Sequence, residues 1–318
     1  MAHAPVATEC TEQSQAQIPG AESGAWLMRL LHRWRHRARA NTPAGSRRNI
    51  RHHYDLGNDF YARWLDAGMS YSSAMFCDPG QSLEDAQAAK HDRIMELLDV
   101  QPGHSVLEIG CGWGGLAEHL AAAGCAVTAV TLSPAQHDFA RARLQRAGLA
   151  DRVDLRLQDY RSVEGAYDRI VSIEMLEAVG EAWWPTWFDL LRTRLRPDGT
   201  VVFQSITIDD ARFEFYRRNA DFIQRYIFPG GMLPSPGALR AQIARAGLAP
   251  HAMEAFGESY ALTLRIWQER FQAAWPDIAA SGFNDRFRRM WEYYLSYCEA
   301  GFRTHSVDVS LWRLGHAC

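Results

Sequence analysis

The sequence lacks the usual marks of secreted, membrane-spanning and metal-binding proteins. Its six cysteines are scattered and form no Cys-x-x-Cys pair, which argues against a disulfide framework and against a zinc site. No apolar run approaches the roughly 20 residues that a membrane-spanning helix needs. The first residues also lack the apolar core of a secretory signal. We therefore expect a globular protein of the cytoplasm with no bound metal.

Acidic residues are missing from one long stretch of the chain. Residues 23–54 contain eight arginines and neither aspartate nor glutamate, although the whole chain carries a formal net charge of −3. Apolar residues recur there at helical spacing: Trp26, Leu27, Leu30, Leu31 and Trp34. An apolar stripe beside a basic face is typical of a helix at a membrane interface, where each arginine contributes about 1 kcal/mol near an anionic leaflet. A leader that packs on its own domain is an equally good interpretation.

We expect residues 1–47 to form a disordered leader followed by this basic amphipathic helix. On the membrane interpretation, the arm would hold the protein at the inner face of the membrane as a peripheral protein. Nucleic acid is not an expected partner, because no recognition fold accompanies the charge.

Alternating strands and helices indicate the fold of residues 48–318. With 47% hydrophobic residues, the chain can bury a large core. Strands are predicted at 105–110, 126–131, 152–157, 167–173 and 199–206, and helices at 115–123, 134–147 and 183–195. Such alternation predicts an α/β protein with a parallel, doubly wound, Rossmann-like sheet.

The pattern changes after residue 206. One long helix is predicted over 210–228, and later segments are predicted as helices at 236–246, 260–275 and 283–302 and as strands at 248–256 and 307–314. This is more helix than a plain sheet needs, so we expect a helical cap, with a lid inserted at about 207–240.

A glycine-rich turn follows the first predicted strand. Gly110, Gly112, Gly114 and Gly115 allow a tight turn and a close approach to a small ligand at the start of a helix. A dinucleotide site would need the spacing Gly-x-Gly-x-x-Gly and an acid about 20 residues further on. These demands are not met cleanly, because the second predicted strand ends in Thr131, Leu132 and Ser133 and not in Asp or Glu. The turn alone leaves a ligand cradle and a purely structural βα turn open.

Taken together, the segments resemble the cyclopropane-fatty-acid synthase and mycolic-acid cyclopropane synthase family of S-adenosylmethionine-dependent methyltransferases. The segments that carry the resemblance are His53–Tyr61, Met69–Phe76, Leu107–Gly115, Val130–Ser133, Gln158–Arg161, Glu177–Gly180, Tyr226–Gly231 and Phe271–Trp275. They follow the family order from about residue 50 to the end. The resemblance implies a seven-stranded Rossmann-like methyltransferase sheet.

The resemblance also implies where the cofactor binds. The pair of residues at 71 and 72 would close over S-adenosylmethionine, the glycine loop would carry its methionine portion, and the later residues would lie around its ribose and adenine. The cofactor-binding residues implied in this way are Tyr71, Ser72, Glu108, Gly110, Gly112, Leu132, Gln136, Gln158 and Asp159. Aromatic walls such as Tyr71 and Trp113 are compatible with a sulfonium cation.

The reaction that the resemblance implies is methyl transfer to the double bond of an unsaturated phospholipid acyl chain. Loss of a proton from the new methyl group then closes a cyclopropane, so a base is needed in a dry pocket. In the family, a bound bicarbonate takes that part. The residues implied around it here are Ser73, Glu177, Gln204, Ile206 and Tyr260. We expect loss of Glu177 to cripple the chemistry.

Two positions depart from the bacterial pattern, because Ser73 replaces a cysteine and Gln204 replaces a histidine. A glutamine can donate a hydrogen bond to an anion but cannot relay a proton. The product therefore stays open between a cyclopropane and a methyl or methylene branch made by a fatty-acid C-methyltransferase. A membrane-surface binding module is the non-enzyme alternative, and a homodimer is compatible with the sequence.

Overall fold

The computed structural model describes residues 56–78 and 80–317. The leader and basic helix predicted for residues 1–47 lie outside these described residues. In the part of the chain that the structure describes, no helix combines the length and the apolar character needed to cross a membrane.

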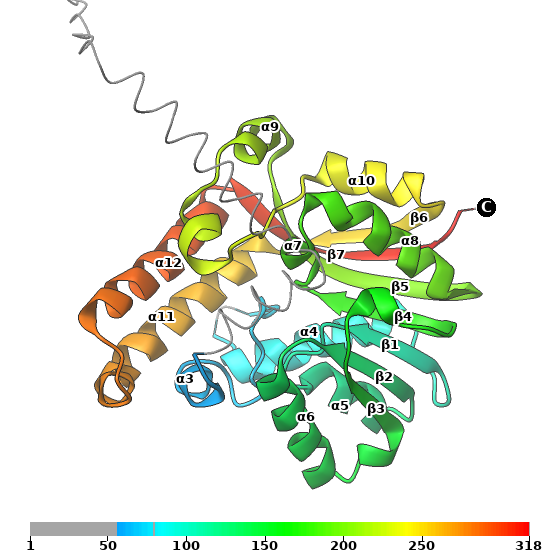
Figure 1. Ribbon diagram of the computed structural model, residues 1–318, viewed down its shortest axis with the longest axis horizontal. Coiled ribbons are helices and arrows are strands. Elements are labelled where there is room, and N and C mark those ends of the chain that lie inside the picture. Colours follow the sequence, from blue (N-terminus) through cyan, green and yellow to red (C-terminus); the bar gives the residue numbers. More distant parts are fainter. Residues whose placement is uncertain (1–55, 79, 318) are drawn as a thin grey trace, which may run out of the picture. The chain divides into compact units, whose positions relative to one another are not determined.

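Seven strands form one sheet, as the sequence predicts (Figure 1). They are β1 (Ser105–Ile109), β2 (Ala126–Thr131), β3 (Val153–Leu157), β4 (Tyr167–Ile173), β5 (Leu195–Ile208), β6 (Leu248–Ala255) and β7 (Val307–His316). Their order is β3-β2-β1-β4-β5-β7-β6. The neighbours from β3 to β5 pair in parallel, whereas β7 lies antiparallel to both β5 and β6. The prediction of a parallel sheet therefore holds for the first five strands and is wrong for the last.

Helices cover both faces of the sheet, which confirms the doubly wound architecture. One face carries α4 (Leu83–Leu98), α5 (Gly115–Ala122) and α6 (Pro134–Arg146); the other carries α7 (Leu176–Val179), α8 (Trp184–Arg194) and α10 (Pro236–Arg245). Side chains alternate along β1, so Val106 packs in the core of the first face and Leu107 in that of the second. Both are fully buried because both faces are covered.

A helical cap packs beside the sheet through aromatic side chains. It contains α3 (Asn58–Ala62) and the adjacent helices α11 (Gly257–Ala280) and α12 (Asp285–Arg303) (Figure 1). The ring of Phe60 lies 6.3 Å from that of Phe271 on α11 and 5.2 Å from that of Trp291 on α12. Such edge-on contacts join segments that are more than 200 residues apart in the chain.

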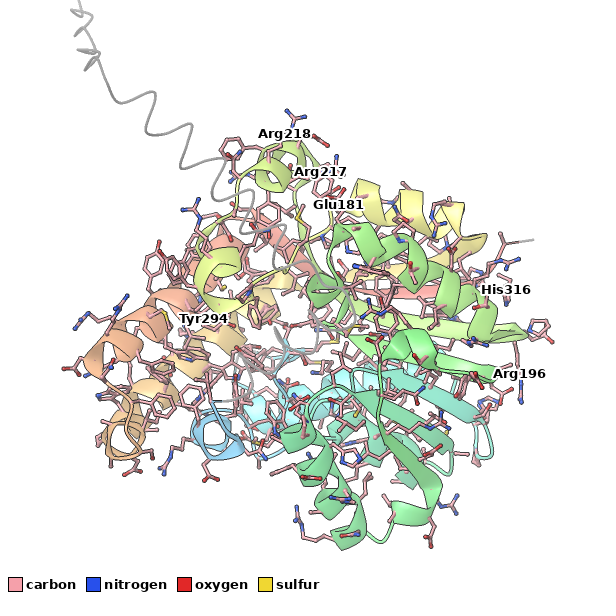
Figure 2. All side chains as sticks on the ribbon, in the orientation of Figure 1. Glu181, Arg196, Arg217, Arg218, Tyr294 and His316 are labelled. Atoms are coloured by element: carbon pink, nitrogen blue, oxygen red, sulfur yellow. The ribbon has the colours of Figure 1, made fainter. Side chains whose placement is uncertain are left out.

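The long helix predicted over 210–228 is broken, so that prediction is wrong. Helix α9 (Asp210–Arg218) is short, and a separate π-helical turn follows at Ile223–Ile227. The Asp221 carboxylate accepts a hydrogen bond of 2.9 Å from the amide of Gln224. This side chain caps the new turn and competes with a continuous helix. An ion pair of 2.7 Å between Arg217 and Glu181 fastens α9 to the segment after α7 (Figure 2).

Candidate active site

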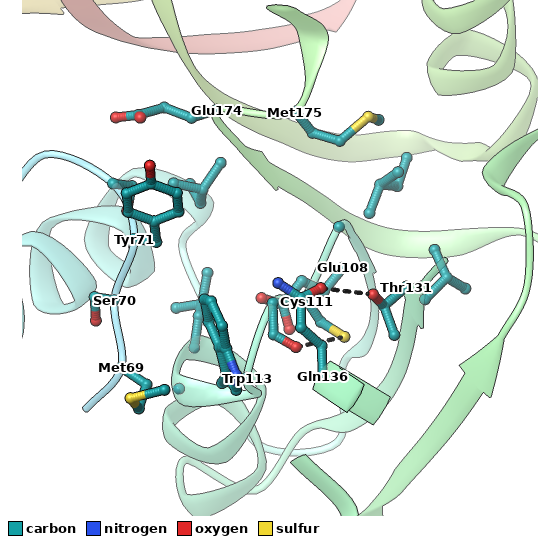
Figure 3. A pocket seen from close by; sticks show the side chains of 18 of the residues that line it. Met69, Ser70, Tyr71, Glu108, Cys111, Trp113, Thr131, Gln136, Glu174 and Met175 are labelled. Atoms are coloured by element: carbon teal, nitrogen blue, oxygen red, sulfur yellow. Dashed lines mark hydrogen bonds between the residues drawn. The ribbon is translucent and has the colours of Figure 1, made fainter. Parts of the chain in front are cut away.

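A pocket opens at the carboxyl ends of β1, β2 and β4. Between β1 and β4 the strand order reverses, which is where doubly wound sheets bind ligands. The cavity measures about 180 Å³ and is lined by the glycine loop, by residues 68–72 before α4 and by residues 173–175 after β4 (Figure 3).

The glycine loop forms one wall of this pocket. Its backbone has positive φ angles, which residues with a side chain adopt only with steric strain. Gly110 has a φ of +85° and Gly114 a φ of +82°. A Cβ atom at Gly110 would lie 2.9 Å from Cγ of Met175, and one at Gly114 would lie 2.9 Å from Cβ of Ala140. Glycine at these two positions therefore meets both a backbone and a packing requirement.

Glu108, on β1, places a carboxylate at this wall. Its side chain is 3% exposed, and Oε2 has no hydrogen-bond partner among the described residues. Burial raises the pKa of Glu108 to about 8. A ligand with an ammonium group would supply the missing donor and favour the charged carboxylate. The methionine portion of S-adenosylmethionine carries such a group, so the residues present fit this cofactor.

Most of the cofactor residues implied by the sequence come together here. The pocket lining includes Tyr71, Ser72, Glu108, Gly110, Gly112, Leu132, Gln136 and Gln158. Asp159 is the exception among the described residues, because it does not belong to the lining. It forms an ion pair of 2.7 Å with Arg161 and caps the turn that follows β3, so its contacts explain its position without a ligand.

Two aromatic rings also line the pocket. Trp113 and Tyr71 both line it (Figure 3). The Tyr71 hydroxyl lies 3.0 Å from that of Tyr294 on α12, and the Tyr71 ring lies 5.5 Å from that of Trp267 on α11. The helical cap thereby sets the position of the Tyr71 ring.

Four of the five residues implied in catalysis converge on a carboxylate that the sequence reasoning did not select. Glu174 Oε1 accepts hydrogen bonds from the backbone amide of Ser73 at 2.9 Å and from the side-chain amide of Gln204 at 2.6 Å. Glu174 Oε2 accepts one from the hydroxyl of Tyr260 at 2.7 Å. The fourth residue, Glu177, is electrostatically coupled to Glu174.

The backbone at Glu174 is unusual. Its φ is +48°, in the left-handed region that favours glycine. The amide of Glu174 donates to the carbonyl of Gln204 at 2.9 Å, which extends the pairing of β4 with β5. This conformation turns the side chain towards the pocket, and Glu174 belongs to the pocket lining (Figure 3).

Glu177 lies one helical turn further on, and it contacts the remaining predicted residue. Its Oε1 accepts a hydrogen bond from the backbone amide of Ile206, while Oε2 is buried without a partner among the described residues. Burial, and then the charge of Glu174, raise the pKa of Glu177 to about 8. At neutral pH, Glu177 is therefore mainly protonated beside the hydrogen-bonded carboxylate of Glu174.

Lys90 brings a positive charge to the same place. It is 1% exposed, and its Nζ donates a hydrogen bond of 2.7 Å to Oγ of Ser72. Burial lowers the pKa of Lys90 to about 8, although Glu174 and Asp66 favour its charged form. Burial raises the pKa of Glu174 above its ordinary value, although its hydrogen bonds and the charge of Lys90 act in the opposite direction.

A bicarbonate ion does not fit this arrangement. The donors that the resemblance assigns to it at Ser73, Gln204 and Tyr260 already donate to Glu174. An anion placed there would also face a second negative charge at short range. Within residues 56–78 and 80–317, no group of three or more His, Cys, Asp or Glu side chains could hold a metal ion.

Several known proteins are similar to this chain in sequence and in fold. A model of the family described as mycolic acid cyclopropane synthetase matches residues 42–312. Tuberculostearic acid methyltransferase UfaA1 of Mycobacterium tuberculosis is 45% identical over 285 residues, which cover 85% of this chain and 65% of that relative. Cyclopropane-fatty-acyl-phospholipid synthase of Escherichia coli is 43% identical over 267 residues, which cover 82% of this chain and 65% of the relative. The chain thus spans less than two thirds of the length of these two relatives.

Two solved structures have the same fold over most of the chain. Mycolic acid cyclopropane synthase CmaA1, complexed with SAH and CTAB, superposes with a TM-score of 0.79 at 27% identity, covering 84% of this chain and 97% of that one. The cyclopropane synthase MmaA2 from Mycobacterium tuberculosis gives a TM-score of 0.79 at 28% identity, with the same coverage.

Proposed function

The chain belongs to the mycolic acid cyclopropane synthetase family of S-adenosylmethionine-dependent methyltransferases, and we propose that it methylates a double bond in an unsaturated phospholipid acyl chain and closes a cyclopropane there. One observation carries the proposal. The pocket combines a glycine loop and a buried carboxylate, Glu108, whose Oε2 has no partner among the described residues, with an oriented carboxylate, Glu174. The first two features suit the methyl donor, and the third suits a reaction that releases a proton.

Different residues of the pocket would bind different parts of the methyl donor. When bound, S-adenosylmethionine supplies an electrophilic methyl group on a sulfonium. Glu108 would pair with its ammonium group, and the backbone of Gly110 and Gly112 would hold its methionine portion. The rings of Tyr71 and Trp113 would stabilise the cationic sulfur, which an aromatic face attracts.

The helical cap protects the reaction from water. Methylation of a double bond leaves a carbocation on the acyl chain, and water would trap it as an alcohol. The side chains of Trp64, Trp267 and Trp291 are almost fully buried and pack with Tyr71, Tyr260 and Tyr294 in one aromatic cluster. This cluster lies next to the pocket and leaves little room for water there.

A methyl or methylene branch is the second candidate product. It is favoured by the 45% identity to a relative named tuberculostearic acid methyltransferase, which is similar to the 43% identity to a cyclopropane synthase. Both outcomes begin with the same methyl transfer. They differ in the reaction by which the resulting carbocation is converted to a stable product. The residues described here are compatible with either.

We further propose that the protein works at the inner face of a membrane, because a phospholipid is its expected substrate. The basic arm at residues 23–54 would provide the contact, and it lies outside the described residues. A homodimer remains a prediction. A protein that only binds membranes would lose vesicle binding on deletion of residues 1–45 and would show no turnover that depends on Glu177.

Lipids from cells that express the chain distinguish these products. A cyclopropane and a methylene branch each add one CH₂ to the acyl chain, so their masses agree. Proton NMR separates them, because ring protons resonate far upfield and methylene protons resonate in the alkene region. We expect ring signals. Extracts identical to those from cells without the chain would contradict the proposal.

A further inference from the structure

The carboxylate of Glu174 occupies the place where the resemblance puts a bound anion. We propose that Glu174 is the base that accepts the proton released in the reaction, so that the chain needs no bicarbonate. This inference rests on the proposed function for the reaction step. Its structural part, an anion site filled by a side chain of the chain itself, can be tested separately.

The hydrogen bonds around Glu174 describe a site for an ionised carboxylate. Its two oxygens accept three hydrogen bonds, from the amide of Ser73, the side chain of Gln204 and the hydroxyl of Tyr260. A protonated acid would need an acceptor, and Oε1 faces two nitrogen donors. Donors that converge on one group are what an anion site provides.

Glu174 also borders the pocket that we assign to the methyl donor, whereas its neighbour Glu177 does not. Within the described part of the chain, Glu174 belongs to the lining of the methyl-donor pocket and Glu177 does not (Figure 3). A base must lie within hydrogen-bond reach of the proton that it removes. Of these two acids, Glu174 is therefore the one that can meet a methyl group just delivered to the substrate.

The backbone of Glu174 is a second, independent observation. A left-handed φ costs a residue with a side chain about 1 kcal/mol or more, and glycine would avoid this cost. Strained residues that persist despite such a cost cluster at functional sites. The strain at Glu174 places its carboxylate between the pocket and the three donors.

The surrounding charges keep Glu174 ready to accept a proton. Burial raises the pKa of Glu174, which makes it a stronger base, while its three hydrogen bonds and Lys90 favour the ionised form. The neighbouring Glu177 is mainly neutral at pH 7 and so adds little repulsion. Gln204 donates without titrating, so it does not compete for the proton as an imidazole would.

The step balances without any further reactant. The π electrons of the double bond form a C–C bond to the methyl carbon, and the C–S bond breaks with its electron pair on sulfur. Glu174 then takes a proton from the new methyl group. The electron pair of that C–H bond closes the ring, and Glu174 becomes a neutral carboxylic acid that must later release its proton.

Glu174→Gly is the variant that tests this proposal. It removes the carboxylate and relieves the left-handed strain, so the melting temperature should not fall. It also leaves a cavity with three donors, which bicarbonate can enter. We expect turnover in buffer freed of CO₂ to fall by about 100-fold or more and to recover in part when bicarbonate is added. The wild type should be indifferent to bicarbonate.

Binding of ¹³C-bicarbonate, followed by NMR line broadening, gives a readout that does not depend on activity. We expect binding to Glu174→Gly and none to the wild type. Glu164→Gln, which changes an exposed glutamate, serves as the control and should behave as the wild type in every assay. S-adenosylhomocysteine affinity should be the same in all three proteins.

Three outcomes would overturn the proposal. They are a wild type that needs bicarbonate, a Glu174→Gly protein with full turnover and no added anion, and a Glu174→Gly protein that neither turns over with bicarbonate nor binds it. A wild type that methylates no lipid would instead contradict the proposed function, and the bicarbonate-binding experiment would still test whether Glu174 fills an anion site.

Discussion

The side-chain amide of Gln204 lies 2.6 Å from Oε1 of Glu174 and donates a hydrogen bond to it across the ends of β5 and β4. Glu174 directly follows β4 and lines the pocket, whereas Gln204 lies within β5 and is fully buried. The substitution that made the sequence depart from the family pattern is thus matched by an acid that follows the neighbouring strand. Gln204 and Glu174 therefore form a hydrogen-bonded pair, in which the glutamine orients the carboxylate and does not itself take the part of a histidine.

Gln204→Leu should move the pH dependence of turnover to higher pH. The leucine keeps the volume but removes a hydrogen bond to a charged group, which is worth about 1.5 to 3 kcal/mol. The pKa of Glu174 rises, so the active, ionised form appears only at higher pH. The measurement is the pH profile of kcat, with S-adenosylhomocysteine binding as the test of folding. An unchanged profile would show that Gln204 does not act on the base.

Replacing Glu177 should have an effect that depends on the substitute. Because Glu177 is mainly neutral at pH 7, Glu177→Gln keeps an uncharged group beside Glu174 and an acceptor for the amide of Ile206. Glu177→Ala removes both and leaves a cavity. We expect turnover to drop far more in the alanine variant. Equal turnover in the two variants would contradict a neutral Glu177.

Glu177 should also make stability depend on pH. Its pKa is about 8 in the folded state and near its ordinary value of 4.5 in the unfolded chain. Between these values the folded state keeps a proton that the unfolded state has lost, so the free energy of unfolding falls as pH rises, by up to about 1.4 kcal/mol per pH unit. Urea unfolding from about pH 5 to pH 8 should show a shallower slope for Glu177→Gln. A slope equal to that of the wild type would place the pKa of Glu177 in its ordinary range.

Glu108→Gln should separate cofactor binding from stability. The amide removes a buried acid without a partner among the described residues, so the free protein should be more stable than the wild type above pH 5. The charge that pairs with the ammonium group is lost, and calorimetry should show S-adenosylhomocysteine binding weakened by about 10-fold or more. Unchanged affinity would mean that Glu108 does not contact the ligand. NAD should bind to neither protein.

Gly110→Ala tests the glycine loop against a matched control. The new Cβ would lie 2.9 Å from Cγ of Met175, whereas one at Gly148, with a φ of +66°, would meet nothing within 4 Å. Both alanine variants should lose about 1 to 2 kcal/mol of stability from the positive φ. Only Gly110→Ala should also weaken S-adenosylhomocysteine binding, because Met175 and the loop share the pocket. Equal affinities would assign Gly110 to the turn alone.

The sheet could be predicted from the sequence because its signals are local. Apolar runs end in glycine or polar turns, and each run became a strand close to the predicted bounds. No local signal determines the direction of β7. Its antiparallel direction depends on how the chain returns after α12 to a place between β5 and β6. The break after Arg218 escaped prediction because the Asp221 cap overrode helical periodicity.

Glu174 shows why part of the site could not be predicted. Its three donors come from residues 73, 204 and 260, which only the tertiary fold brings together. Its left-handed backbone is also invisible in the sequence. One signal was present, because an acid follows β4 directly and a non-titrating glutamine lies within the next strand, β5. Asp159 also follows a strand, but it pairs with Arg161, caps the turn after β3 and does not belong to the pocket lining.

The most direct test of the account is to follow the methyl group itself. The protein is incubated with S-adenosylmethionine carrying a ¹³C-labelled methyl group and with vesicles of unsaturated phospholipid, and the acyl chains are then examined by ¹³C NMR. The account predicts the label in a ring CH₂ at the former double bond, with S-adenosylhomocysteine as the second product. Label in a methyl or methylene branch would move the assignment to the second candidate. Acyl chains that stay unlabelled while the protein binds S-adenosylhomocysteine would contradict the central claim.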